Sequence, residues 1–232
     1  MNNYIDAHNH IVDKTPIKSL YNTISISDVQ NIVKNGKHLL AVGIHPEYLE
    51  SISDIEYVEN IIKDNPTFFI GEIGLDRRFN DRSLQLEGFN KFLSIANRYN
   101  RPISIHCVKE WGALLHSMSE EFNQDIPHIY HGFSGSLEVL KQIIPGNSFF
   151  SFSIRELSRV KLTPIIKYIP MNKILIESDI STAIYREIGI TRYLDIVEES
   201  YKIISNIKIM SLDDVTNNIY SNFSKYIERI IE

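Results

Sequence analysis

Hydrophobic and polar positions along the chain repeat one pairing: a short apolar run, a polar turn, and a longer stretch with helical periodicity. Several apolar runs are hydrophobic on both faces, which is typical of strands buried between a core and a layer of helices. The pairing recurs eight times, with strands expected at residues 4–10, 19–26, 39–45, 68–75, 102–107, 128–133, 148–153 and 173–179.

The clearest predicted helix covers residues 82–99, and two more helices, around 190–206 and 211–231, follow the last strand. One face of the helix at 82–99 carries an apolar stripe, which we interpret as packing against the sheet and not as a binding surface. The stripe consists of Leu84, Phe89, Phe92, Leu93 and Ala96.

Eight strand–helix pairs predict an α/β fold in which a parallel sheet closes on itself. The most economical solution is a (β/α)8 barrel, or TIM barrel, with residues 1–232 as one domain. The stretch TPIKSLYNTISIS, residues 15–27, is too short to hold a full helix before the second strand. A shortened second strand–helix unit is therefore the alternative to a regular barrel.

Composition supports a single folded domain. The 232 residues are 43% hydrophobic and 23% charged, so a sizeable core can form without disulfides. Cys107 is the single cysteine, and the first residues, MNNYIDAHNH, lack the pattern of a secretory leader, so we expect a cytoplasmic protein. No apolar run reaches the roughly 18 residues of a spanning helix, so we expect no membrane role.

The net charge of −5 argues against sequence-independent coating of nucleic acid. It does not exclude a nucleic-acid substrate, because a nuclease needs only a locally positive cleft and bound divalent metals would supply positive charge.

Histidines and carboxylates gather where the predicted strands end. Asp6, His8 and His10 are spaced by two, so on an extended strand they share one face and two imidazoles can meet one ion. Solvated histidines at a strand end would show the same spacing. Catalytic groups of such barrels project from the carboxyl ends of the strands, which favours the metal hypothesis.

Glu72 lies in the otherwise apolar strand FFIGEIGLD, between Gly71 and Gly74. A buried carboxylate is costly unless it is paired or bound to a cation, and the glycines allow close backbone approach. A buried salt bridge is the alternative, but the neighbouring strands offer no obvious cationic partner.

His106 and His131 each follow an apolar run, and Asp179 ends KILIESD two residues after Glu177. Each alone is explained by hydrogen bonding or by helix capping. Together with the groups above they form a set of nitrogen and carboxylate ligands suited to zinc, manganese, iron or magnesium. The chemistry that follows is hydrolysis by metal-activated water.

The chain resembles the TatD family of metal-dependent deoxyribonucleases, within the wider amidohydrolase-like barrels. The matching segments are DAHNH, GIHPE (43–47), GEIGLD (71–76), the helix with Gln85 and Phe89, PISIHC (102–107), HGFSGS (131–136), FSFS (150–153), LIESD (175–179) and, weakly, NNIYSNF (217–223).

The resemblance implies two divalent ions, of magnesium, manganese or zinc. His8, His10, Glu72 and Asp179 would hold one; Glu72, shared, would hold the second with His106 and His131. It further implies cleavage of DNA, often from the 3′ end of single strands. Asp179 would orient the attacking hydroxide or take its proton, so Glu72 and Asp179 are the predicted catalytic residues.

Other side chains near strand ends are candidates for substrate binding. Arg77, Lys109 and Arg155 could contact phosphate and Trp111 could stack on a base, although loop or packing roles are the simpler interpretation. His45, ahead of Pro46, is interpreted as fixing a turn or supporting the site.

Two other functions remain open at this stage. The same metal barrel could serve an amidohydrolase or deaminase acting on a small molecule, because one fold hosts many chemistries. A non-enzymatic scaffold would be expected to lack at least one metal ligand, and the sequence contains all six predicted ligands, His8, His10, Glu72, His106, His131 and Asp179. No obligate protein partner is indicated.

Overall fold

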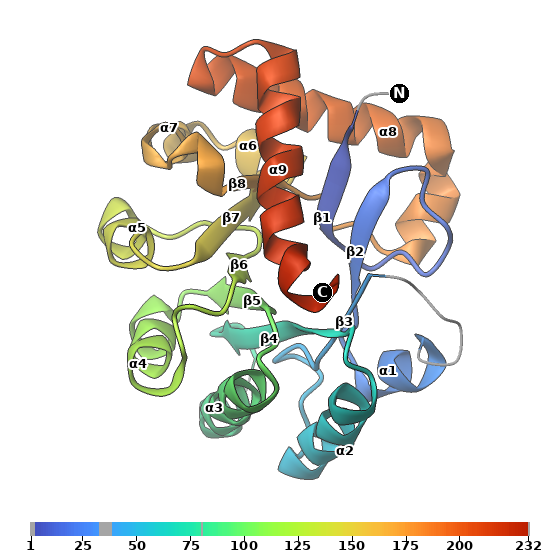
Figure 1. Ribbon diagram of the computed structural model, residues 1–232, viewed down its shortest axis with the longest axis vertical. Helices are drawn as coiled ribbons and strands as arrows, with labels where there is room; N and C mark the ends of the chain where they lie inside the picture. The colour runs from blue at the N-terminus through green and yellow to red at the C-terminus, as the bar shows by residue number, and fades with distance from the viewer. Residues whose placement is uncertain (1–2, 33–38, 80, 232) are drawn as a thin grey trace. The chain divides into compact units, whose positions relative to one another are not determined.

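The computed structural model describes residues 3–32, 39–79 and 81–231 of the chain (Figure 1). Eight parallel strands follow one another in chain order around a single sheet. They confirm the eight predicted strands, mostly with shorter bounds: β1 (Ile5–Asn9), β2 (Lys18–Asn22), β3 (Leu40–Val42), β4 (Phe69–Asp76), β5 (Ile103–Val108), β6 (His128–Tyr130), β7 (Ser148–Phe152) and β8 (Ile174–Ile176).

Helices alternate with the strands after β2. They are α1 (Ile26–Ile32), α2 (Ile52–Asp64), α3 (Arg82–Tyr99), α4 (Trp111–Glu121), α5 (Leu137–Ile143), α6 (Ile154–Leu157), α7 (Thr163–Tyr168), α8 (Thr182–Lys208) and α9 (Leu212–Ile231), with short 3-10 turns η2 (Val160–Leu162) and η3 (Met171–Lys173).

The chain forms a TIM barrel with an irregular start. No helix lies between β1 and β2 in the described residues, as the shortness of that stretch predicted. The first and last strands also meet: the carboxyl end of β1 is hydrogen-bonded to the segment that follows β8. The backbone N–H of Asp179 donates to the His8 carbonyl at 3.1 Å, and that of His10 donates to the Ile180 carbonyl at 2.9 Å.

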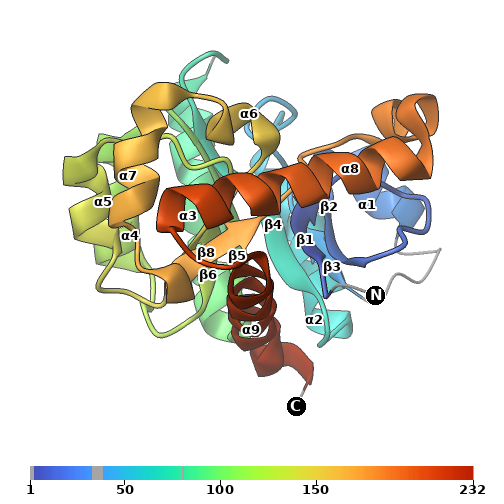
Figure 2. The same cartoon turned by 90° about the horizontal axis from the view of Figure 1, so that it is seen from above.

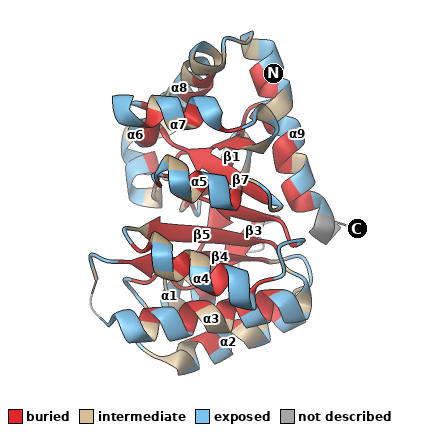
Figure 3. Cartoon of the chain, turned by 90° about the vertical axis from the view of Figure 1, so that its left-hand side faces the viewer, coloured by how far each residue is buried: buried red, intermediate tan, exposed pale blue. Residues whose placement is uncertain are grey.

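The chain divides into two compact units. One unit takes its residues from Asn22–Tyr130 and Ile227–Glu232. In it, α2, α3 and α4 flank the strands with their exposed faces outward, while β4 and β5 are buried (Figure 3). Helix α3 has the predicted bounds, beginning after the Asp81 cap and ending at Asn100, and buries the predicted stripe except for the half-buried Leu84.

The other unit takes its residues from Met1–Tyr21 and His131–Tyr226. Its longest helix, α8, begins earlier than predicted and bends at Gly189, where φ is 74° (Figure 2). Among the described residues, no helix has the length and hydropathy needed to cross a membrane.

Asn222 ties α9 to the strand layer of this unit. Its side-chain amide, 1% exposed, donates to the carbonyls of Met171 and Ile174 at 2.8 Å each. Replacing Asn222 with alanine leaves two carbonyls near the core without this donor, and we expect a loss of about 2–3 kcal/mol of unfolding free energy. Urea unfolding measures it. The matched control is Asn218→Ala, whose exposed amide donates only to Asp214 of its own helix; a loss as large as that of Asn222→Ala would contradict this account.

Candidate metal-binding site

In the unit that contains β1, three histidines lie against one another. His8 is fully buried in β1, and its ring stacks on that of His131 with centroids 4.0 Å apart and an angle of 6° between planes. The ring of His10 meets that of His8 edge-on at 5.0 Å. The two-residue spacing of His8 and His10 therefore places both imidazoles in one cluster, and His131, predicted as a ligand of the other ion, stacks on His8 in this cluster.

Asp179 completes this cluster at the segment after β8. Its Oδ1 lies 3.5 Å from Nε2 of His10, and its Oδ2 accepts a hydrogen bond from Nη2 of Arg155 at 3.1 Å. One ligand atom each of His8, His131 and Asp179 lie within 4.8 Å of one another. Two imidazoles and a carboxylate at that spacing match the donors that divalent transition metals prefer.

The buried carboxylate of Asp6 stabilises the backbone segments that carry the cluster. It accepts hydrogen bonds from the backbone N–H of His8, the amide of Asn9, the N–H and hydroxyl of Ser178 and the hydroxyl of Tyr193. Burial raises the pKa of Asp6, although these hydrogen bonds act in the opposite direction. Asp6 thus joins the strand of His8 to the segment that carries Asp179.

Replacing Tyr193 with phenylalanine removes one donor from Asp6 without changing packing. The bond is 2.9 Å long and wholly buried, so we expect a loss of about 1.5–3 kcal/mol of unfolding free energy. Chemical denaturation measures it. Tyr185→Phe is the control, because its hydroxyl donates to the Lys14 carbonyl, a neutral acceptor, at 3.3 Å. Equal losses in the two variants would show that Asp6 does not depend on Tyr193.

Glu177 lies beside His131. It is fully buried, accepts from the backbone N–H of Gly132 at 2.9 Å and from the hydroxyl of Ser151, and its Oε1 lies 3.6 Å from Nδ1 of His131. Burial raises the pKa of Glu177 to about 7, against the opposing effect of His131. Carboxylates in this position fix the ring orientation of ligating histidines. The spacing of Glu177 and Asp179 pointed to it, but it was not among the predicted site residues.

In the unit that contains β4, Glu72 lies between two histidines. Its side chain is 3% exposed, and Oε1 lies 2.7 Å from Nδ1 of His106 and 3.7 Å from Nε2 of His45. The imidazoles of His45 and His106 therefore supply the partners that Glu72 was predicted to need. His45 Nδ1 also accepts the backbone N–H of Glu47 at 3.1 Å, so this histidine both fixes its turn and lines the cluster.

Asp76 is a site residue that sequence reasoning missed. It is fully buried, and its Oδ2 lies 2.9 Å from Nε2 of His106. Arg78 donates hydrogen bonds to the same carboxylate through Nε and Nη2. Burial alone would raise the pKa of Asp76, but hydrogen bonds with His106 and Arg78 prevail and hold it well below its ordinary value. A signal was available, because Glu72 and Asp76 are four residues apart and share one face of β4. Ligand atoms of His45, Asp76 and His106 lie within 4.8 Å of one another.

Two glycines of β4 permit this arrangement. A Cβ on Gly71 would lie 2.7 Å from Cβ of Ser104, and one on Gly74 would lie 1.9 Å from the His106 carbonyl oxygen. Gly74 also has a φ of 153°. The backbones of β4 and β5 therefore approach closely, as the glycines flanking Glu72 predicted.

The predicted substrate residues of this unit surround Glu110 and α4. Arg77 is exposed, with Nε 3.5 Å from Oε1 of Glu110. Lys109 is exposed and has a φ of 57°. Trp111 begins α4 and packs on Tyr130, with ring centroids 6.0 Å apart. The geometry here gives Arg77 an ion pair and Trp111 a packing partner.

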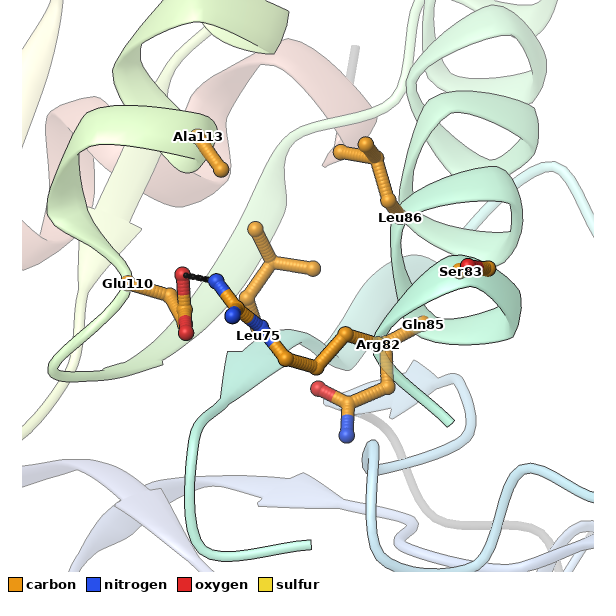
Figure 4. A pocket seen from close by; sticks show the side chains of 7 residues that line it. All are labelled: Leu75, Arg82, Ser83, Gln85, Leu86, Glu110 and Ala113. Carbon is orange, nitrogen blue, oxygen red and sulfur yellow. Dashed lines mark hydrogen bonds and ion pairs between the residues drawn. The ribbon is translucent and has the colours of Figure 1, made fainter. Parts of the chain in front are cut away.

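A small pocket of about 200 Å³ lies beside Glu110 (Figure 4). Nη2 of Arg82 donates to Oε2 of Glu110 at 2.7 Å within it. No sequence signal marked Arg82. The remaining lining residues are Leu75, Ser83, Gln85, Leu86 and Ala113.

Comparison with known proteins identifies the family. The family model described as TatD related DNase matches residues 11–228. The chain belongs to the TatD family. The resemblance found in the sequence motifs is thereby confirmed over nearly the whole chain.

Relatives within and around the TatD family support a hydrolase. MJ1582 of Methanocaldococcus jannaschii, named as a metal-dependent hydrolase, is 27% identical, and the alignment covers 97% of each chain. A TATDN1 homologue of Encephalitozoon cuniculi, whose name proposes a deoxyribonuclease, is 25% identical over 64% of this chain and 54% of its own. Among solved structures, the TatD homologue YJJV of Escherichia coli superposes with a TM-score of 0.78 at 18% identity, covering 97% of this chain and 98% of its own. The protein is a metal-dependent hydrolase of this family with a TIM-barrel fold.

Proposed function

We propose that the protein is a deoxyribonuclease that hydrolyses phosphodiester bonds of DNA, releasing nucleotides from the 3′ ends of single strands. The observation that carries this proposal is the pair of largely buried imidazole–carboxylate clusters, in a chain that matches the TatD related DNase model. Catalytic groups of TIM barrels lie at the carboxyl ends of the strands.

The residues present fit two divalent cations. His8, His10, His131 and Asp179 in one unit, and Glu72 and His106 in the other, are the proposed ligands. Buried carboxylates and neutral imidazoles are the donors that Zn²⁺ and Mn²⁺ accept, and Mg²⁺ accepts the carboxylates. When bound, such ions supply an activated water and stabilise negative charge on phosphoryl oxygens.

The chain's own groups perform the remaining tasks. We infer that Asp179, whose side chain is 20% exposed and lies 3.5 Å from His10, accepts the proton of the attacking water. Asp76 holds His106 in a fixed orientation through a hydrogen bond, and Glu177 lies beside Nδ1 of His131 at 3.6 Å. A fixed set of donors costs little reorganisation when the reaction occurs.

Cleavage of end-labelled DNA tests the proposal. Purified protein with its bound metal quantified is incubated with single- and double-stranded DNA carrying a label at either end. We expect stepwise shortening from the 3′ end, faster on single strands, and suppression by chelators. Absence of cleavage with magnesium, manganese and zinc alike would reject DNA as the substrate.

Salt dependence separates a nuclease from a hydrolase of small amides or rings. Contact with several phosphates releases counterions, so the affinity of a nuclease for DNA should fall steeply as salt rises. A small-molecule hydrolase of the same fold would show a flat dependence for its substrate and no specific retention of DNA.

A further inference from the structure

Arg155 is anchored by a buried carboxylate. It lies in the first turn of α6, where Ser153 and Glu156 form a capping box. Its Nε donates to Oε1 of Glu156 at 2.8 Å, and Glu156 is 1% exposed. Because the acceptor is itself held in the helix cap, the guanidinium is fixed in orientation instead of moving freely in solvent.

The far end of the same guanidinium reaches the metal-ligand cluster. Its Nη2 donates to Oδ2 of Asp179 at 3.1 Å, and a Cβ on Gly132, the residue after His131, would lie 3.7 Å from that nitrogen. Arginine has five N–H donors, and these contacts engage only Nε and Nη2. In the described part of the chain Nη1 donates to no acceptor, and the side chain is 59% exposed.

We propose that the exposed edge of Arg155 binds a phosphoryl oxygen of the substrate beside Asp179, with Glu156 as the residue that positions it. This inference rests on the proposed phosphodiester hydrolysis and adds the group that holds the substrate's anion. The guanidinium keeps three of its five N–H donors, two on Nη1 and one on Nη2, and its planar fork suits two-point contact with the oxygens of a phosphoryl group.

The charges around Arg155 make the binding conditional. Glu156, Glu177 and Asp179 all face it, and although burial lowers the pKa of Arg155, these acids raise it above its ordinary value. One cation among three carboxylates gives a negative environment. We therefore expect anion binding only when divalent cations occupy the adjacent ligands and offset that charge.

Arg159 provides a matched control. Its Nη2 lies 3.9 Å from the same Oε1 of Glu156, its side chain is 42% exposed, and it makes no ion pair with Asp179 within the described residues. The two arginines thus share a carboxylate partner and differ in their contact with the cluster.

The experiment measures binding of inorganic phosphate to the metal-loaded protein by calorimetry, for wild type, Arg155→Met, Arg155→Lys and Arg159→Met. For Arg155→Met we expect the dissociation constant to rise about tenfold or more, since a charge-assisted hydrogen bond is lost. Arg155→Lys should recover part of the affinity, because it keeps the charge and loses the two-point geometry. Arg159→Met and the bound metal content should match wild type. Chelated wild type should bind no phosphate.

Three results would overturn the inference. Unchanged phosphate affinity in Arg155→Met would show that Arg155 does not touch the anion. Loss of metal in that variant would assign Arg155 to holding Asp179 instead. Binding of phosphate by the chelated protein would contradict the charge argument. If Arg155-dependent phosphate binding is found but no DNA is cleaved, the inference stands and the proposed substrate fails.

Discussion

Replacing Glu72 with glutamine is expected to lower the rate of hydrolysis by about a thousandfold, equivalent to ~4 kcal/mol of transition-state stabilisation. Glu72 is buried at 3% exposure, and its Oε1 contacts His106 at 2.7 Å. Glutamine keeps the shape but removes the negative charge, so the site should lose affinity for divalent cations as well as activity. Metal content and steady-state kinetics measure the two effects.

The control for Glu72→Gln is Glu56→Gln on α2, an exposed carboxylate paired with Lys91. It should retain metal content and activity within about twofold, because exposed ion pairs contribute little. Full activity in Glu72→Gln would remove this carboxylate from the mechanism. A similar loss in both variants would point to a general effect on folding.

Asp179→Asn carries the second large expected effect, a loss of about a thousandfold in kcat with a stable fold. Asp179 has a φ of 55°, in the left-handed region that asparagine tolerates, so the substitution keeps the backbone conformation. What it removes is the carboxylate that, in the proposed mechanism, accepts a proton. Pre-steady-state and steady-state kinetics should place the loss in the chemical step.

Asp81→Asn is matched to Asp179→Asn in both chemistry and backbone. Asp81 has a φ of 56° and caps α3, where asparagine serves equally well. Activity and unfolding free energy should be close to wild type. If Asp179→Asn is as active as Asp81→Asn, another group takes the proton.

The sequence was sufficient to predict the barrel because its signals are local. Short apolar runs, which alternate along the chain with helical stretches, predicted all eight strands, and helix α3 has the predicted bounds. The stretch before β2 was too short for a helix, and none forms there in the described residues. The largest error in a predicted strand end is at β2, which was expected to reach residue 26 and ends at Asn22. Ile24 and Ile26 alternate with polar residues beyond it, as in a half-buried strand, but the chain enters α1 at Ile26 instead.

The partners within the site depended on contacts between distant segments. The spacing of His8 and His10 could be read directly, whereas the stacking of His131 on His8 follows from the path of the folded chain. The spacing of Glu72 and Asp76 is a local signal, but the contact of Asp76 with His106 depends on the pairing of β4 with β5. Arg155 was a candidate only by its position after a strand; its anchoring by Glu156 is visible in the structure alone.

Metal removal and restoration test the central claim most directly. The purified protein is stripped with a chelator, its metal content is confirmed to be zero by mass spectrometry, and hydrolysis of DNA is measured before and after each divalent ion is added back. The account predicts no hydrolysis by the stripped protein, recovery with at least one of magnesium, manganese and zinc, and no recovery in Glu72→Gln. Hydrolysis by the metal-free protein at the wild-type rate would contradict it.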